Sequence, residues 1–396
     1  MLASRYPARG LLVTLVAALL GCSSEPAGTV GSWRLGAPMI EARGGHSATL
    51  LPSGLVLVAG GAGTWHEDGS ADLLATAELY DPVTGTWTPA ASMSSPRGWH
   101  SATLLQNGRV LVAGGIGAQF PGRYTDLTSA ELYDPSTDRW EVTGSMAWPR
   151  DGDALLLPDG QVLVAGACLD DGTVLAVSER YDPVSGTWAD AGALPAAQYA
   201  TPMVLLGPSG PVLLAGGAVS RCTTWDTAGL TSRAHLYDLA SRTWRETAPL
   251  PFSVADNTLT RLPTGEVLLT SGGRGQTQNP GGPALLFDPV QETWRPAGPM
   301  VWTHHRPEAL LLPSGRVLVA AGDWMDDKNA AQAPGGDVYD AGLDAWSPTP
   351  VLRHHVLCWC AAVNLPNGEV LLTGGDIFSP GPGGQSAISA VQLFRE

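Results

Sequence analysis

Short apolar runs separated by turn residues dominate the sequence. The run SATLL (47–51) is followed by a Pro-Ser-Gly turn and by the run VLVAGG (56–61). After a variable stretch, the run AELYD (77–81) and a second turn lead to a segment that contains Trp87. Small turn residues between β-rich runs are strong hairpin signals. The pattern predicts four antiparallel strands, named A to D in chain order, in a unit of about 50 residues.

This unit recurs along the chain. From the second tryptophan of the series onward, an aromatic residue lies seven positions before each one. A glycine pair ends most B strands and is degraded to Gly166-Ala167 and Ala321-Gly322 in two units. Radial repetition of four-stranded units is typical of a propeller. The sequence therefore predicts an all-β fold, a seven-bladed β-propeller of four-stranded blades. The tryptophans of the series are Trp33, Trp87, Trp140, Trp188, Trp244, Trp294 and Trp346.

The last unit lacks a fourth strand, because it stops after the run VQLF (391–394). The segment SWRL (32–35) carries the missing tryptophan at the other end of the propeller sequence. We expect this N-terminal strand to close the last blade, since an incomplete blade would expose an open sheet edge. The prediction places Trp33 beside Phe394.

The glycine pair, the Tyr-Asp-Pro sequence and the tryptophan seven residues after the tyrosine resemble the kelch repeat over 31–396. The resemblance implies the seven-bladed scaffold that galactose oxidase, a copper-radical enzyme, also uses. The copper site of that enzyme includes a Tyr-His dipeptide, which this chain lacks. We also expect no further domain after the seventh blade, so the resemblance supports the fold and argues against the oxidase chemistry.

The N-terminus has the features of an export signal. Arg5 and Arg9 precede a short apolar run (11–20), which is too short to span a bilayer. The run ends in Leu-Leu-Gly-Cys, which resembles a bacterial lipobox with lipidation at Cys22. The alternative is an ordinary secretory signal that is cleaved nearby. We predict a lipoprotein signal peptide (1–21), a tether (22–30) and a propeller (31–396), anchored to the bacterial cell envelope at the outer membrane or cell surface.

Composition narrows the class of partner. The chain has 49 Gly and 32 Pro, which suit many turns, and its hydrophobic content of 44% argues against disorder. Its formal charge of -15 argues against nucleic-acid binding, which needs a basic surface. We expect a monomer without a cofactor that meets the membrane only through its lipid anchor.

The aromatic residues outside the repeat indicate which face carries function. Because strand direction alternates, the B–C loops and the D–A crossovers lie on one face of a propeller, and all seven remaining tryptophans fall in them. One interpretation is that long loops use tryptophan for small cores of their own. The set as a whole favours a recognition surface, because these side chains offer large rigid contact area. The residues are Trp65, Trp99, Trp148, Trp225, Trp302, Trp324 and Trp359.

The kelch resemblance implies that residues at the start of strand A, and those after the glycine pair, surround the central pocket. For His46 and His100 a framework role is an equal alternative, because both precede the same SATLL strand. The predicted ligand-binding residues are His46, Trp99, His100, Asp151, Asp256, Asn257, Arg274, Arg306, Asp323, Trp359 and Asp376.

Cysteine and histidine chemistry is sparse. Export to an oxidising compartment makes a disulfide between Cys168 and Cys222 plausible, because both follow the glycine pairs of adjacent blades. The weak metal-ligand candidates lack a paired C-x-x-C spacing, so we do not expect a metal site. These candidates are His354, His355, Cys358 and Cys360.

The preferred function is a non-catalytic binding module for a protein or a glycan, acting through the B–C loop and D–A crossover face. The alternatives are a carbohydrate-active or metal-dependent enzyme on the same face, and a structural or assembly protein of the envelope. No serine triad, P-loop or dinucleotide motif stands out in the sequence.

Overall fold

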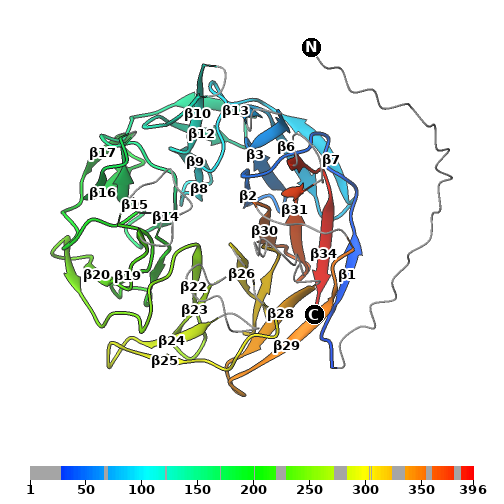
Figure 1. Ribbon diagram of the computed structural model, residues 1–396. Coiled ribbons are helices and arrows are strands. Elements are labelled where there is room, and N and C mark those ends of the chain that lie inside the picture. Colours follow the sequence, from blue (N-terminus) through cyan, green and yellow to red (C-terminus); the bar gives the residue numbers. More distant parts are fainter. Residues whose placement is uncertain are drawn as a thin grey trace, which may run out of the picture.

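The structure is a computed structural model. It describes residues 28–66, 70–120, 123–169, 171–199, 201–219, 229–271, 283–302, 304, 306–322, 335–353, 359–378 and 385–396. These residues form an all-β ring of seven four-stranded antiparallel sheets, as the repeat predicts (Figure 1). Within the described residues no helix is long and apolar enough to cross a membrane.

Each blade consists of four strands in the order A to D from the centre of the ring outward (Figure 1). Blade 1 holds β2 (Ser47–Leu50), β3 (Val56–Ala59), β6 (Ala77–Asp81) and β7 (Thr86–Ala90). Blade 2 holds β8 (Ser101–Leu104), β9 (Val110–Ala113), β12 (Ala130–Asp134) and β13 (Arg139–Val142). Blade 3 holds β14 (Ala154–Leu156), β15 (Val162–Cys168), β16 (Val174–Asp182) and β17 (Thr187–Asp190). Blade 4 holds β18 (Met203–Leu205), β19 (Val212–Ala215), β20 (Ala234–Asp238) and β21 (Thr243–Glu246).

The remaining blades follow the same order. Blade 5 holds β22 (Asn257–Arg261), β23 (Val267–Ser271), β24 (Ala284–Asp288) and β25 (Thr293–Pro296). Blade 6 holds β26 (Glu308–Leu311), β27 (Val317–Ala320), β28 (Gly335–Asp340) and β29 (Ala345–Val351). Blade 7 holds β30 (Ala361–Asn364), β31 (Val370–Thr373), β34 (Val391–Arg395) and, on its outer edge, β1 (Ser32–Leu35).

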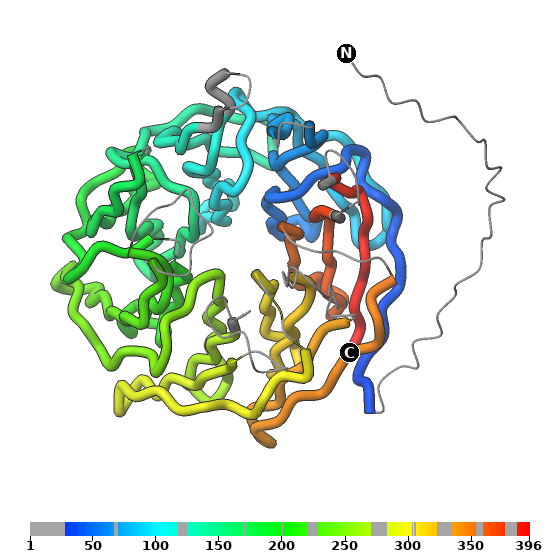
Figure 2. Tube along the Cα trace, viewed as in Figure 1, coloured from blue at the N-terminus to red at the C-terminus, as the bar shows by residue number. Residues whose placement is uncertain are grey.

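The N-terminal strand closes the ring. Trp33 lies opposite Phe394 in the antiparallel register of β1 and β34, and their ring centroids are 5.0 Å apart. The Trp33 indole also donates a hydrogen bond of 3.0 Å to the Thr349 hydroxyl of blade 6. Figure 2 shows the N-terminal segment running beside the last strands of the chain. The predicted closure and the predicted contact of Trp33 with Phe394 are confirmed.

Hydrophobic packing lies mainly between blades. Each of the seven interfaces between neighbouring blades has its own buried cluster. The repeated aromatic pair contributes to these clusters, as in Tyr80 and Trp87, which lie opposite each other with ring centroids 4.9 Å apart. The Trp87 indole donates to the Ala37 carbonyl of the crossover that leads into blade 1. The repeated tryptophans therefore serve the framework, as predicted.

Three B–C loops contain short hairpins that the four-strand pattern did not predict. They arise where the chain continues in an extended conformation past the glycine pair and turns back on itself. The pairs are β4 (Ala62–Trp65) with β5 (Ala71–Leu73), β10 (Ile116–Phe120) with β11 (Arg123–Asp126), and β32 (Asp376–Phe378) with β33 (Gln385–Ala387).

Candidate functional site

A residue one or two positions before strand A has an unusual backbone in several blades. Trp99, Asp256, Arg306 and Trp359 have φ values of 53°, 54°, 55° and 57°. Residues other than glycine seldom adopt this left-handed conformation, and it costs roughly 1–3 kcal/mol unless the surroundings impose it. Four large aromatic or charged side chains are thus held at equivalent positions at the inner edge of the ring.

Blade 1 has Gly45 at this position, with φ of 62°. A Cβ atom there would lie 2.7 Å from the Trp99 ring, so only glycine leaves room for the indole. The Gly45 amide donates to the Trp359 carbonyl, and the Trp99 amide donates to the Gly45 carbonyl, each at 2.7 Å. These bonds link the entrances of blades 7, 1 and 2 through their backbones.

Tryptophan side chains form one part of the site. The Trp359 ring stacks on Trp65 with centroids 5.9 Å apart and meets Trp99 edge-on at 5.3 Å. All three side chains are partly buried. Trp65 comes from the hairpin after the glycine pair of blade 1, whereas the other two come from the starts of blades 2 and 7. Chain segments far apart in the sequence therefore build one aromatic surface.

Charged side chains continue this surface. The Arg306 guanidinium lies over the Trp359 ring, 5.4 Å from its centroid, and its Nε is 3.2 Å from Oδ1 of Asp256. The Tyr199 hydroxyl donates a hydrogen bond to Asp151. We call the set Trp65, Trp99, Asp151, Tyr199, Asp256, Arg306 and Trp359 the mouth.

Charged groups on other blades influence the pKa of Asp151. Burial raises the pKa of Asp151, while the hydrogen bond from Tyr199 lowers it. The charge of Arg306 also lowers this pKa and that of Asp256 raises it, so groups from blades 5 and 6 act on a residue of blade 3. Burial, followed by the charge of Asp151, raises the pKa of the Tyr199 phenol, which therefore stays protonated as the donor.

Two further carboxyl groups lie where strand A begins in blades 3 and 6. Asp153 follows Asp151 by two residues, and Glu308 follows Arg306 by two residues. Glu308 is partly buried, whereas Asp153 is exposed. Partial loss of hydration raises the pKa of Asp153. It also raises the pKa of Glu308 to about 8, with a further contribution from the negative charge of Asp153.

Four predicted ligand-binding residues are buried framework positions. The His46 Nε2 is 2.9 Å from the Thr373 hydroxyl, and the His100 Nε2 is 2.9 Å from the Ser47 hydroxyl. The Asn257 amide donates to the Ala215 carbonyl at 3.2 Å. Each contact reaches the preceding blade, which explains why a polar residue recurs at the start of strand A. The fourth residue, Asp376, is fully buried at the start of β32.

The remaining predicted residues fall mostly outside the described part of the chain. Cys168 is disulfide-bonded, but its predicted partner Cys222 lies outside the described residues, so that pairing stays a prediction. Cys360 is buried. In the described ranges, no group of three or more His, Cys, Asp or Glu is placed to hold a metal ion. The other predicted residues outside these ranges are Cys22, Arg274, Asp323, His354, His355 and Cys358.

A second set of repeated charges was not predicted from the sequence. Arg97, in the D–A crossover, donates to the carbonyls of Gly114 and Ser129 at 3.0 Å each and to Glu131 at 3.0 Å. Both ionic side chains are almost fully buried. Equivalent ion pairs join Arg43 to Glu78 and Arg150 to Glu179. The regular spacing of the arginines, at 43, 97 and 150, was the available signal. These ion pairs anchor the crossovers into blades 1 to 3, two of which carry Trp99 and Asp151 of the mouth.

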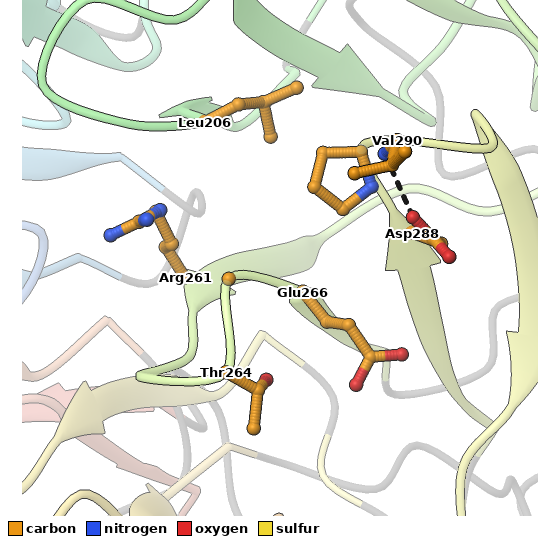
Figure 3. A pocket seen from close by; sticks show the side chains of 8 residues that line it. Leu206, Arg261, Thr264, Glu266, Asp288 and Val290 are labelled. Atoms are coloured by element: carbon orange, nitrogen blue, oxygen red, sulfur yellow. Dashed lines mark hydrogen bonds between the residues drawn. The ribbon is translucent and has the colours of Figure 1, made fainter.

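A pocket of about 410 Å³ lies on the opposite face, at the A–B and C–D turns of blade 5 and beside Leu206 of blade 4 (Figure 3). Two of its charged residues, Asp288 and Glu266, have structural partners. Asp288 accepts a hydrogen bond of 2.8 Å from the Val290 amide, and Glu266 pairs with Arg295 at 3.1 Å. The mouth therefore remains the better candidate for function.

The fold defines the chain as a seven-bladed β-propeller. The kelch motif model matches residues 42–94 and 100–147. The chain is 26% identical to Kelch-like protein 25 of Xenopus tropicalis over 56% of its length and 35% of that protein. It is also 26% identical to the Kelch-like protein terF of Aspergillus terreus, over 69% of its length and 62% of that protein. It thus spans less than two thirds of either relative.

A solved structure with the same architecture is described as a novel fungal alcohol oxidase of the AA5 family in complex with copper. The TM-score is 0.68 at 16% sequence identity, over 92% of this chain and 76% of that one. At this identity the likeness concerns the fold alone.

Proposed function

We propose that this protein is a non-catalytic binding module that recognises a protein partner through the mouth and the loops around it. The observation that carries the proposal is the set of partly buried aromatic and charged side chains held at equivalent blade entrances. Aromatic residues and arginine dominate binding energy at protein interfaces. Left-handed backbone recurs at four of these positions and holds their side chains at equivalent places in the ring.

The kelch relatives support a protein partner rather than a small substrate. Kelch propellers typically serve as protein-interaction modules, and kelch proteins commonly bind protein partners. A glycan is the second ligand class that tryptophan surfaces suit, so the experiment includes it. Export and lipidation at Cys22 are part of the proposal, and they would hold the mouth at the cell envelope.

The test is affinity capture from an envelope extract with the purified protein. Trp99→Gly and Trp359→Gly remove the indoles, and glycine is suited to the left-handed backbone at both sites. The matched control is Val184→Ala, which removes a 95% exposed apolar side chain on the opposite face. We expect one protein to be captured by the parent and the control but not by the two glycine variants, with thermal unfolding confirming that all four are folded.

Other outcomes would contradict the proposal. Equal capture by the glycine variants would exclude the mouth as the binding surface. Glycan binding that depends on both tryptophans, without protein capture, would favour the glycan. Stoichiometric copper or zinc in the purified protein would favour an enzyme. Loss of fatty-acid labelling in a Cys22→Ser variant tests the anchor separately.

A further inference from the structure

The crossover into blade 6 is anchored in the same way as those of blades 1 to 3, but by different residues. In blade 2, Arg97 donates to a carbonyl of the glycine pair and to Glu131. In blade 6, His304 occupies the place of the arginine and Asp337 that of the glutamate. Asp337 lies opposite the third residue of strand B, as Glu131 does in blade 2. The two pairs are therefore equivalent in the repeat.

The contacts of His304 join the crossover to strands B and C of its blade. Its Nδ1 is 2.8 Å from the carbonyl oxygen of Ala321, the first residue of the degraded glycine pair. Its Nε2 is 3.3 Å from Oδ2 of Asp337, which also accepts a hydrogen bond of 2.9 Å from the Trp302 amide. Both side chains of the His304–Asp337 pair are fully buried.

These contacts determine the protonation state of His304. A carbonyl oxygen only accepts hydrogen bonds, so Nδ1 donates to Ala321. The Nε2 atom then faces a carboxylate, and in a neutral ring it would present a lone pair to another acceptor. Only the protonated imidazole, in which both nitrogens donate, satisfies both partners. His304 and Asp337 thus form a buried ion pair.

The His304–Asp337 pair differs from the ion pairs of blades 1 to 3 in one chemical property. An arginine guanidinium keeps its charge in proteins, whereas a histidine can lose its proton near neutral pH. When His304 loses its proton to solvent, Asp337 remains as a buried carboxylate without a cation, which is strongly unfavourable. The anchoring of this crossover therefore weakens as the pH rises, unlike that of blades 1 to 3.

The other charged groups around the pair supply no replacement cation. Among the described residues, β27 and β29 carry no charged side chain, and β28 adds Asp340 at its far end. Strand β26 begins with Glu308, another acid. In the neighbouring blades, β22 has Arg261 at its far end and β30 has no charged side chain. The cation of the same crossover, Arg306, pairs with Asp256 of the mouth at 3.2 Å.

The anchored crossover carries Arg306 into the mouth. Arg306 follows His304 by two residues, and its guanidinium lies over the Trp359 ring, 5.4 Å from the centroid. Its backbone is left-handed, with φ of 55°. Such a conformation persists only where the surrounding structure imposes it. Weakening the buried attachment two residues away should therefore relax this backbone and move Arg306 off Trp359.

We propose that the His304–Asp337 pair is a pH-dependent anchor of the mouth. It holds Arg306 over Trp359 while His304 is protonated, and it releases Arg306 when His304 loses its proton at higher pH. His304 is thus a positioning residue. This inference rests on the proposed function, because it describes how partner binding at the mouth is regulated.

The first test observes His304 directly. The purified full chain is labelled with ¹⁵N-histidine, and the His304 signals are assigned by their absence in His304→Gln. We expect both ring nitrogens of His304 to be protonated at about pH 6 and one of them to lose its proton by about pH 9. Asp337→Asn removes the carboxylate that favours the charged ring, so the midpoint of this change should move to lower pH.

The second test observes the mouth. In protein labelled with fluorotryptophan, the ¹⁹F signal of Trp359 is assigned by its absence in Trp359→Gly. It should shift with the same pH midpoint as His304. The double variant His304→Arg with Asp337→Glu reproduces the ion pair of blades 1 to 3, so its Trp359 signal should stay constant.

An exposed histidine pair provides the matched control. His66 is 47% exposed and lies 3.0 Å from Asp72, in the hairpin that carries Trp65. His66→Gln should leave the pH response of Trp359 unchanged. Partner capture from the envelope extract should be several-fold weaker at high pH for the parent and for this control, but independent of pH for the double variant.

Three results would overturn the inference: a neutral His304 at about pH 6, a Trp359 response that persists in the double variant, or a response that His66→Gln abolishes. Thermal unfolding checks that each variant is folded. If the double variant does not fold, an unchanged midpoint in Asp337→Asn refutes the anchor by itself.

The two proposals fail separately, because the NMR measurements need no partner. Capture that depends on Trp99 and Trp359, together with a Trp359 signal that does not respond to pH, would refute the anchor alone. Unchanged capture by the tryptophan variants would refute the mouth as the partner site.

Discussion

The buried ion pair between Arg97 and Glu131 allows a quantitative test of what holds the crossovers in place. Arg97 is fully buried, and burial lowers its pKa while the charge of Glu131 raises it. Glu131 also accepts a hydrogen bond of 2.7 Å from the Ser94 amide in the same crossover. Replacing Arg97 with alanine leaves an uncompensated carboxylate in the interior and removes the donor to two buried carbonyls.

The expected cost follows from these contacts. Removing one partner of a buried ion pair typically costs about 3–5 kcal/mol, because the remaining charge stays desolvated without compensation. An exposed pair contributes about 1 kcal/mol or less. Blade 2 provides such a pair in Arg109 and Glu141, whose side chains are 25% and 66% exposed. Arg97→Ala should therefore destabilise the protein several times more than Arg109→Ala.

The assay is urea unfolding followed by tryptophan fluorescence. With a slope of about 3 kcal/mol/M, the loss corresponds to a shift of the midpoint by about 1–1.7 M. The double variant Arg97→Met with Glu131→Leu should recover much of the loss, since it removes both charges together. If Arg97→Ala and Arg109→Ala shift the midpoint equally, or if the double variant is less stable than Arg97→Ala, the burial argument is wrong.

Three further outcomes are expected. Trp33→Ala should lower the free energy of unfolding in urea by about 3–5 kcal/mol, because Trp33 is 4% exposed and packs on Phe394 where the ring closes. A loss below about 1 kcal/mol would mean that the closure contributes little to stability. Glu308 has a folded-state pKa near 8, above its ordinary value, so its ionisation should reduce stability as the pH rises from about 5 to 8. Glu308→Gln should flatten this part of the stability profile, and an unchanged profile would contradict the assignment. Gly114→Ala should destabilise the protein more than Gly54→Ala. Both glycines have positive φ, but only at Gly114 would a Cβ atom clash, because it would lie 2.3 Å from the Arg150 carbonyl oxygen. Equal melting temperatures of the two variants would contradict this prediction.

The sequence by itself determined the ring and its closure. Strand pairing within a blade is local: turns such as the one at Gly54 and alternation of apolar residues set it within about 50 residues. The fixed position of one tryptophan in each unit likewise predicted that these seven residues pack between the blades. The last unit lacks a fourth strand, and the segment around Trp33 was predicted to supply it. The register of β1 with β34 confirms this prediction.

The mouth could be predicted only in part. Trp99, Asp256, Arg306 and Trp359 were named from their equivalent positions in the repeat, and the structure places them at one inner edge with the same left-handed backbone. The sequence could not separate these residues from the adjacent His46 and His100. One step along the chain turns a side chain from the mouth to the neighbouring blade, as the contacts of His46 and His100 show.

The tertiary structure alone decided which residues far apart in the sequence interact. Trp65 stacks on Trp359, and Asp153 acts on Glu308, although about 294 and 155 residues separate the members of these pairs along the chain. Such contacts depend on the number of blades and on the width of the ring they close. Glu308 looks like an ordinary surface carboxylate in the sequence, and its burial in the ring raises its pKa. Local sequence periodicity determines the strands of each blade. Closure of the ring determines which side chains of different blades come together at its centre.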